Sequence, residues 1–305
     1  MLERVVSLLY FSYTYEDNMM SLSVVLATFN EEKNLDECLS SVKDLASEIV
    51  VVDGKSTDNT VDIAKNYKAR VVVTENHPIF HINKQKAIDM ATSDWVLQLD
   101  ADERVSPELA KEISKVMDMS ESELEVYQAS LPNKELFKRH QKLLEERDGK
   151  IGDKGDYVAF FIPRLNFFLG RYLKHGGVYP DGVIRLFRRG KAYLPAKDVH
   201  EQMAVKGRVG WLESPLFHKD SPTFERYLSR NSRYIDLLAT QLKDGKVSKH
   251  PLAMVNYLAI KPLSWFFMTQ IRHKGIFDGW QGIVFSFFSA MRFPRAYMKY
   301  LNQKH

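Results

Sequence analysis

Asp94-Trp95-Val96-Leu97-Gln98-Leu99-Asp100-Ala101-Asp102-Glu103 is the stretch that decides the fold. Its apolar part, Trp95 to Leu99, is typical of a strand buried on both faces in a parallel sheet. Two carboxylates follow at i and i+2, and open α/β sheets bind ligands at the carboxyl ends of their strands. Two ionised carboxylates this close repel each other, and a divalent cation offsets that repulsion. We therefore expect Asp100 and Asp102 to bind Mg²⁺ or Mn²⁺, although an isolated Asp-x-Asp is more often a solvated strand end before a helix, here one starting at Ser106.

Strands alternate with helices around this stretch. The sequence predicts strands over 21–27, 48–52 and 70–74, and helices over 34–42, 61–67 and 83–91. This alternation is typical of βαβ units in a parallel sheet. The loops Thr28–Glu31, Asp53–Thr57 and Asp100–Asp102 then meet at one edge of the sheet. We predict an α/β fold with a mostly parallel central sheet flanked by helices, and a nucleotide bound at that edge.

The bulk composition is that of an ordinary folded protein. The chain has 305 residues, of which 27% are charged and 45% hydrophobic, with a formal net charge of +4. A single cysteine, Cys38, rules out an internal disulfide and suits a reducing compartment. Residues 1–20 contain acids and no long apolar core, so we expect a leader or upstream extension and not a signal peptide. These features predict a cytoplasmic protein without a nucleic-acid partner.

Several familiar nucleotide and hydrolase motifs are absent from the sequence. There is no GxGxxG after the first strand, no GxxxxGK[ST], no GxSxG and no zinc-type Cys/His spacing. The possibility that remains is a nucleotide held by a metal ion and by loops. A sugar-nucleotide-forming nucleotidyltransferase would use similar carboxylates, but no Gly-rich, basic triphosphate loop follows the first strand. A non-catalytic nucleotide-sugar binding protein is a further alternative.

The C-terminal part, 219–305, forms a separate helical region after a main domain at 21–218. Its apolar stretches, 252–260, 263–271 and 282–291, are too short to span a bilayer. Basic residues and aromatic side chains flank them, and from Pro251 onward Asp278 is the single acid in the sequence. This pattern predicts helices that lie in a membrane interface, with contact through 251–300. The alternative is a small helical lobe packed on the main domain.

Three segments, in this order, resemble the glycosyltransferases of family 2, which have the GT-A fold. They are SVVLATFNEEKNLDECLSSV at 23–42, EIVVVDGKSTDNTVDIA at 48–64 and DWVLQLDADE at 94–103. A later run, NFFLGRYLKHGGVYPDGVIRLFRRGKAYLPAKDVHEQM at 166–203, is similar to the bacterial lipopolysaccharide core glucosyltransferases of the WaaE type. The resemblance implies transfer of a sugar, with inversion, from a nucleoside diphosphate donor, with a UDP-sugar favoured. It also implies a cell-envelope, lipopolysaccharide-type or lipid-linked acceptor at the inner face of the cytoplasmic membrane.

The resemblance also implies roles for individual residues that bind the nucleotide sugar. Asp102 matches the metal ligand, and Asp100 matches the ribose or metal carboxylate. Arg185 and Arg188 flank the same cleft, but strand alternation cannot point both the same way, so we expect one to bind phosphate. The remaining matched positions are Thr28, Asn30 and Glu31 in the first nucleotide loop, Asp53 near the base, Lys84 near the diphosphate or base, and Ala101 between the two aspartates.

The catalytic base is the least determined position. Inversion needs a base for the acceptor hydroxyl, and many relatives carry it in a Glu-Asp pair that this chain lacks. Val199-His200-Glu201 stands in the corresponding place, so we assign Glu201 as the base, with Asp181 and Asp198 as alternatives. His200 would ligate the metal or orient Glu201, or it is a packing histidine.

Overall fold

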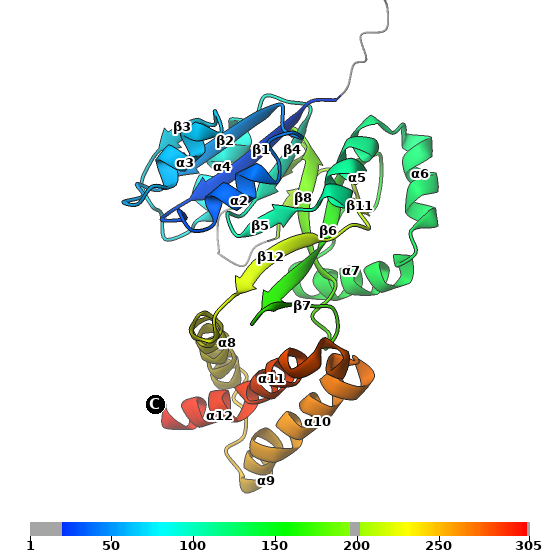
Figure 1. Cartoon of the computed structure of the whole chain (residues 1–305). Helices are drawn as coiled ribbons and strands as arrows, with labels where there is room; N and C mark the ends of the chain where they lie inside the picture. The colour runs from blue at the N-terminus through cyan, green and yellow to red at the C-terminus, as the bar shows by residue number, and fades with distance from the viewer. Residues whose placement is uncertain (1–19, 196–201, 304–305) are drawn as a thin grey trace, which may run out of the picture.

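The computed structural model describes residues 20–195 and 202–303. Among these, the main sheet has the strand order β3-β2-β1-β4-β8-β6-β12-β5, with β7 and β11 paired to β6 (Figure 1). The strands are β1 Leu22–Thr28, β2 Glu48–Asp53, β3 Arg70–Val73, β4 Trp95–Leu99, β5 Glu103–Val105, β6 Tyr157–Phe168, β7 Arg171–Leu173, β8 Asp181–Arg188, β9 Ala192–Tyr193, β10 Ala204–Val205, β11 Arg208–Trp211 and β12 Leu216–Ser221. Strands β9 and β10 pair with each other apart from this sheet.

The parallel half of the sheet confirms the predicted fold class. Strands β3, β2, β1 and β4 are parallel neighbours, with Thr28 opposite Asp53 and Leu26 opposite Leu99. Every residue of β4 is buried, because apolar clusters cover both faces of the sheet. In this register the loops after β1, β2 and β4 leave the sheet at the same edge.

The other half of the sheet is mixed, and the sequence predicted it only in part. Strand β8 is antiparallel to both β4 and β6, and β6 is twelve residues long. Strand β12 was not predicted; it lies parallel to β6 and antiparallel to β5. This pairing sets His218 opposite Asn166 on one side and opposite Glu103 on the other, which brings a histidine to the acidic end of β4.

The helices cover the sheet and then form a second lobe (Figure 1). Ser106 caps the helix predicted to start there, since its hydroxyl accepts from the Leu109 amide at 3.1 Å. The helices are α2 Leu35–Ser40, α3 Thr60–Asn66, α4 His81–Asp89, α5 Pro107–Asp118, α6 Glu121–Ser130, α7 Lys134–Asp148, α8 Phe224–Asp244, α9 Pro251–Val255, α10 Lys261–Phe267, α11 Gly279–Ala290 and α12 Arg292–Asn302.

The C-terminal lobe is a set of short helices packed on α8. Helices α9 and α10 join through a π-helical turn at Asn256–Ile260, a second π-helical turn at Met268–Arg272 follows α10, and a 3₁₀ turn at Gly275–Asp278 leads into α11. Buried Asp278 accepts hydrogen bonds from the Lys174 and His175 amides at 3.0 and 2.7 Å, which ties the lobe to the sheet domain. No helix in the described part of the chain has the length and apolar content needed to cross a bilayer.

Candidate functional site

A cavity of about 450 Å³ lies where the parallel strands end. It brings together residues that are far apart in the sequence, from the loop after β1, from α4, from the acidic stretch and from α8. Of the predicted donor residues, those in its wall are Thr28, Glu31, Lys84, Asp100, Ala101 and Asp102. This cavity, here called the donor cavity, lies at the edge of the sheet where the sequence predicted a bound nucleotide.

The loops after β1 and β2 are fastened to each other by Asp53 and Asn30. Buried Asp53 accepts from the Thr28 hydroxyl at 2.9 Å and from the Ser56 amide at 2.7 Å. Asn30, with a left-handed φ of 54°, accepts from the Thr57 amide at 2.8 Å. Neither Asp53 nor Asn30 lines the donor cavity. The structure therefore places both in the framework that shapes the nucleotide loops.

Asp100 lies among cations. Arg185 donates to its Oδ2 at 2.6 Å, and Lys84 pairs with its Oδ1. Arg185 also donates to Glu103, a fully buried carboxylate, at 2.7 Å. Burial alone would raise the pKa of Asp100, but Arg185 and Lys84 hold that pKa well below its usual range. Asp100 is therefore ionised, and its charge is already offset by protein side chains.

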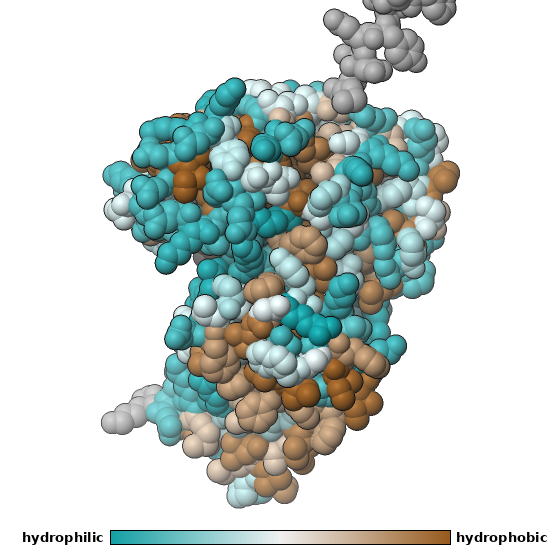
Figure 2. All heavy atoms as spheres, in the orientation of Figure 1, coloured by the Kyte–Doolittle hydropathy of each residue, from teal (hydrophilic) through white to brown (hydrophobic). Residues whose placement is uncertain are grey.

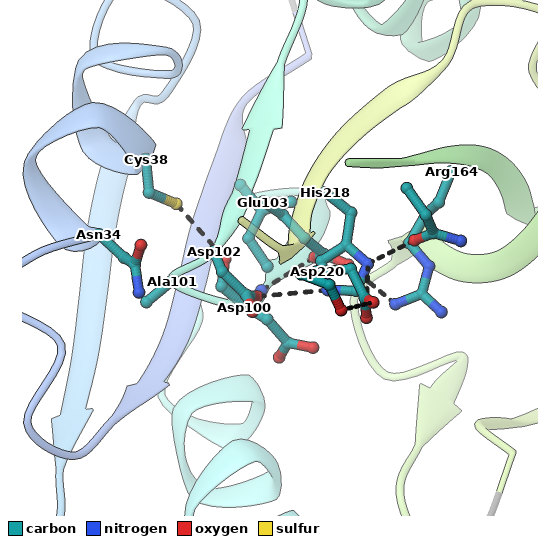
Figure 3. Close-up of polar contacts among 12 residues, drawn as sticks. Asn34, Cys38, Asp100, Ala101, Asp102, Glu103, Arg164, His218 and Asp220 are labelled. Carbon is teal, nitrogen blue, oxygen red and sulfur yellow. Dashed lines mark hydrogen bonds and ion pairs between the residues drawn. The ribbon is translucent and has the colours of Figure 1, made fainter. Parts of the chain in front are cut away.

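Asp102 contacts two groups that the sequence analysis did not assign. Arg226 of α8 donates to its Oδ2 at 2.9 Å. His218 Nε2 lies 3.6 Å from its Oδ1 (Figure 3). Burial raises the pKa of Asp102, but the imidazolium form of His218, through hydrogen bonding and charge, and Arg226 lower it further than burial raises it. Asp102 is therefore ionised at neutral pH and faces an imidazole nitrogen.

A chain of hydrogen bonds sets the orientation of His218. Asp181 Oδ2 accepts from the Asn166 amide nitrogen at 3.0 Å, so the Asn166 carbonyl oxygen faces the imidazole. That oxygen lies 2.6 Å from His218 Nδ1, and an oxygen can only accept there. Nδ1 therefore carries the proton, and in the neutral imidazole Nε2 presents its lone pair toward Asp102. Metal-binding histidines are commonly fixed in this way.

These contacts decide how well the residues fit a metal ion. In the described ranges no three His, Cys, Asp or Glu side chains already surround a common centre. Asp102 and His218 form a partial site, because an imidazole lone pair and a carboxylate facing each other at 3.6 Å favour a cation between them. Asp100 fits less well, since both of its oxygens are engaged by cations. The donor's phosphates would complete the ligand set, as is usual for Mg²⁺.

The pKa of Glu31 is raised, whereas the pKa values of Asp100 and Asp102 are lowered. Burial raises its pKa, and the charges of Asp102 and Asp100 raise it further, against a lowering contribution from its hydrogen bond with Asn34. The Asn34 amide donates to Glu31 Oε2 at 2.8 Å. The donor cavity thus holds a carboxylate whose ionised form is disfavoured, chiefly because the carboxylate is buried.

The two predicted arginines, Arg185 and Arg188, do not line the donor cavity. Arg185 nevertheless contacts Asp100. Arg188 pairs across the sheet with Trp95, at the opposite end of β4, and its guanidinium lies 4.8 Å from that ring centroid. The structure therefore does not bring Arg188 to the donor cavity. Glu201, Asp198 and His200 lie outside the described residues, as do residues 1–19 of the predicted leader.

One signal in the sequence would have found the unassigned arginines of α8. Arg226, Arg230 and Arg233 recur at i, i+4 and i+7, which places all three on one face of α8. Arg230 and Arg233 line the donor cavity, and Arg226 pairs with Asp102. His218 and Asp220 alternate on β12, and that strand was missed because His and Lys interrupt its apolar pattern.

Comparison with known proteins establishes the family. The family model described as glycosyl transferase family 2 matches residues 23–193. An uncharacterized glycosyltransferase of Rickettsia prowazekii is 40% identical over 286 residues, which cover 91% of this chain and 87% of the relative. One of Rickettsia typhi is 28% identical over the same coverage. The chain belongs to glycosyltransferase family 2, and the enzymatic class predicted from the sequence is confirmed.

Two solved structures match this chain over part of its length. Glucosyl-3-phosphoglycerate synthase of Mycobacterium tuberculosis, in complex with Mn²⁺, UDP and glucosyl-3-phosphoglycerate, matches at 27% identity and a TM-score of 0.25, covering 28% of this chain and 34% of that chain. TarS of S. aureus matches at 16% identity and a TM-score of 0.41, covering 84% of this chain and 45% of that chain. The chain thus spans about a third of the first structure and under half of the second.

Proposed function

We propose that this glycosyltransferase is an inverting, metal-dependent enzyme that uses a nucleoside diphosphate sugar, with a UDP-sugar favoured. The observation that carries the proposal is the pairing of Asp102 with a histidine whose Nε2 lone pair is turned toward it. We propose that Asp102 and His218 hold a Mg²⁺ or Mn²⁺ ion together with the donor's diphosphate. Such an ion supplies Lewis-acid stabilisation of the departing diphosphate.

The described residues have separate tasks in the proposed reaction. An acceptor hydroxyl oxygen forms a bond to the anomeric carbon, the bond from that carbon to the diphosphate oxygen breaks, and the hydroxyl proton passes to a carboxylate base. The nucleoside diphosphate leaves carrying the bonding electrons. Arg230 and Arg233 line the cavity on its α8 side, where they add positive charge next to the departing group.

The identity of the base is a separate proposal. Asp181 accepts from Arg164 at 2.7 Å and from Asn166 at 3.0 Å, and its pKa is lowered because these partners outweigh the effect of burial. A carboxylate stabilised in this way is a weaker proton acceptor. We therefore keep Glu201 as the proposed base and give Asp181 the task of orienting Asn166 and His218.

A donor screen tests the proposed function. UDP-, GDP- and dTDP-sugars are added with Mn²⁺, and the shift of the melting temperature and the slow release of free sugar are measured. A UDP-sugar should raise the melting temperature by mass action and be hydrolysed, and Asp102→Ala should abolish both effects. If no nucleotide sugar stabilises the wild type, the proposal is wrong.

The same preparation separates the two alternatives. A nucleotidyltransferase would release pyrophosphate from a nucleoside triphosphate and a sugar 1-phosphate, which we expect this chain not to do. A binding protein would be stabilised by the donor but would release sugar no faster than Asp102→Ala.

We also propose that the C-terminal lobe contacts a membrane surface, where a lipid-linked or lipopolysaccharide-type acceptor would be met. Figure 2 shows hydrophobic side chains gathered over this lobe, whereas the sheet domain is mostly hydrophilic. Basic residues lie among them, with Lys261, Arg272 and Lys274 on this part of the chain. The exposed apolar residues are Leu252, Val255, Leu258, Ile260, Leu263, Phe267, Ile271, Ile276, Phe277, Trp280, Ile283, Phe287 and Met298. A contiguous apolar surface with basic residues is typical of an interfacial element.

A further inference from the structure

A second cavity, of about 430 Å³, lies between the sheet domain and the C-terminal lobe. It shares Arg164, His218 and Arg230 with the donor cavity. A molecule bound in this second cavity would therefore meet a donor at the wall that the two cavities have in common. That position is the one an acceptor must occupy, so we call it the acceptor cavity.

One side of the acceptor cavity is aromatic. Phe168 of β6 packs edge-to-face on Tyr227 of α8 at 4.9 Å between ring centroids, and on Phe285 of α11 at 5.6 Å. All three residues line the cavity. Helix α11 also carries Trp280, Ile283 and Phe287 on the exposed apolar surface of the lobe. The aromatic wall and the proposed membrane surface thus belong to the same helix.

The charges in the cavity wall are paired, with one exception. Asp181 pairs with Arg164, Asp220 with Arg230, and Arg147 with Asp148. Arg292 of α12 has no Asp or Glu within ion-pair distance in the ranges 20–195 and 202–303. Its guanidinium instead stacks on Trp265 at 4.4 Å from the ring centroid. Burial lowers the pKa of Arg292, as expected for a cation without a counter-ion.

An unsatisfied hydrogen-bond donor lines the same cavity. Asn231 is only 7% exposed, and its Nδ2 has no hydrogen-bond partner among the described residues. A buried amide N–H left without a hydrogen-bond partner destabilises the folded protein. A half-buried cation and an unpaired N–H donor in one cavity wall are together suited to a phosphate oxygen.

We propose that this cavity binds an acceptor that carries a phosphate group, held by Arg292 and the Asn231 side-chain amide. The inference rests on the proposed function, since it names the substrate class of the same reaction. The phosphate lies toward the C-terminal lobe, and the rest of the acceptor lies along the aromatic wall with its hydroxyl toward His218 and the donor. A lipid phosphate and a soluble sugar phosphate share this chemistry, and the experiment separates them.

Phosphate binding is measured directly by tryptophan fluorescence, because Trp265 stacks under Arg292. Inorganic phosphate, octyl phosphate below its micelle concentration and neutral octyl glucoside are titrated into the full chain. The variants are Arg292→Gln, Arg292→Lys and Asn231→Leu, each checked by melting temperature. The matched control is Arg295→Gln, which removes the same charge from an exposed position one turn along α12.

We expect Arg292→Gln to weaken phosphate binding at least ten-fold, with Arg292→Lys intermediate and Arg295→Gln unchanged. Tighter binding of octyl phosphate than of inorganic phosphate identifies a lipid acceptor, and equal binding identifies a soluble one. Equal affinities in Arg292→Gln and Arg295→Gln, or equal binding of octyl glucoside, overturn the inference.

Donor binding is scored separately on the wild type. If the wild type binds a donor but Arg292→Gln leaves the phosphate affinity unchanged, this inference alone fails. If Arg292→Gln weakens phosphate binding but the wild type binds no donor, the proposed function fails.

Discussion

Arg226 of α8 donates to Oδ2 of Asp102 at 2.9 Å. An arginine therefore occupies one oxygen of the carboxylate that we propose as the metal ligand. Arg226 is 40% exposed on its side chain and Asp102 only 15%, so the arginine can leave toward solvent more easily than the aspartate. A metal ion held by Oδ1 and His218 would share the negative charge of Asp102 with Arg226, so the two cations would compete for one carboxylate.

Removing this competitor should strengthen metal binding in the absence of nucleotide. We expect Arg226→Gln to tighten Mn²⁺ binding by about two- to five-fold, the range for breaking a partly exposed ion pair. Isothermal titration calorimetry with Mn²⁺ checks it. Lys243→Gln, at the far end of α8, loses the same charge and should bind as the wild type does. Weaker Mn²⁺ binding in Arg226→Gln would contradict the competition.

Asp181 should act on the metal site through Asn166. In Asp181→Asn the new amide no longer enforces the orientation of Asn166, and an inverted Asn166 would present its NH₂ to His218. The imidazole proton would then move to Nε2, so we expect Mn²⁺ affinity to fall at least ten-fold, as for other partners of metal-binding histidines. Exposed Asp153→Asn is the control. A loss of kcat at unchanged Mn²⁺ affinity would instead identify Asp181 as the base.

Glu31 should destabilise the fold when it is ionised. Burial raises its pKa, so the folded state binds this proton more tightly than the unfolded state. For a carboxyl with a raised pKa, stability decreases as pH rises from the unfolded pKa through the folded one. We expect Glu31→Gln to melt at a higher temperature than the wild type at pH 7, with a smaller difference near pH ~4, where the wild-type carboxyl is protonated. Thermal denaturation at both pH values checks it, and an equal difference at both pH values would be evidence against this effect.

The exposed apolar surface of the C-terminal lobe should be needed for membrane binding. Ile271 and Phe277 are 72% and 64% exposed, so replacing both by Glu should leave the fold intact. We expect Ile271→Glu/Phe277→Glu to lose flotation with anionic liposomes, because the substitutions remove apolar contact and add like charge. Val126→Glu is the matched control, since Val126 is 70% exposed on α6. Equal flotation of all three proteins would show that this surface does not bind membranes.

The parallel half of the fold follows from local sequence signals. Buried apolar runs such as Val96 to Leu99, each ended by polar residues, define the strands, and the edge where they end defines the donor cavity. Thr28, Glu31, Asp100 and Asp102 line that cavity for this reason. The roles of Asp53 and Asn30 were not foreseen, because a side chain at a strand end can shape a loop as well as line a cavity.

The remainder of the site depends on long-range pairing. His218 reaches Asp102 only because β12 inserts between β6 and β5, and no local sequence pattern predicts this insertion. Arg185 and Arg188 differ by three positions on one strand, yet one reaches Asp100 and the other Trp95 at the far end of β4. The alternation rule correctly separated the two arginines but could not say which end of β4 each would meet.

The central claim is that Asp102 and His218 together hold the divalent ion that the donor's diphosphate shares. Electron spin echo measurements on Mn²⁺ bound with UDP test it most directly, because a coordinating imidazole nitrogen modulates the echo. We expect this modulation in the wild type, its loss in His218→Ala, and no UDP-dependent Mn²⁺ binding in Asp102→Ala. Mn²⁺ bound with UDP in the wild type without nitrogen modulation, or bound equally well in Asp102→Ala, would contradict it.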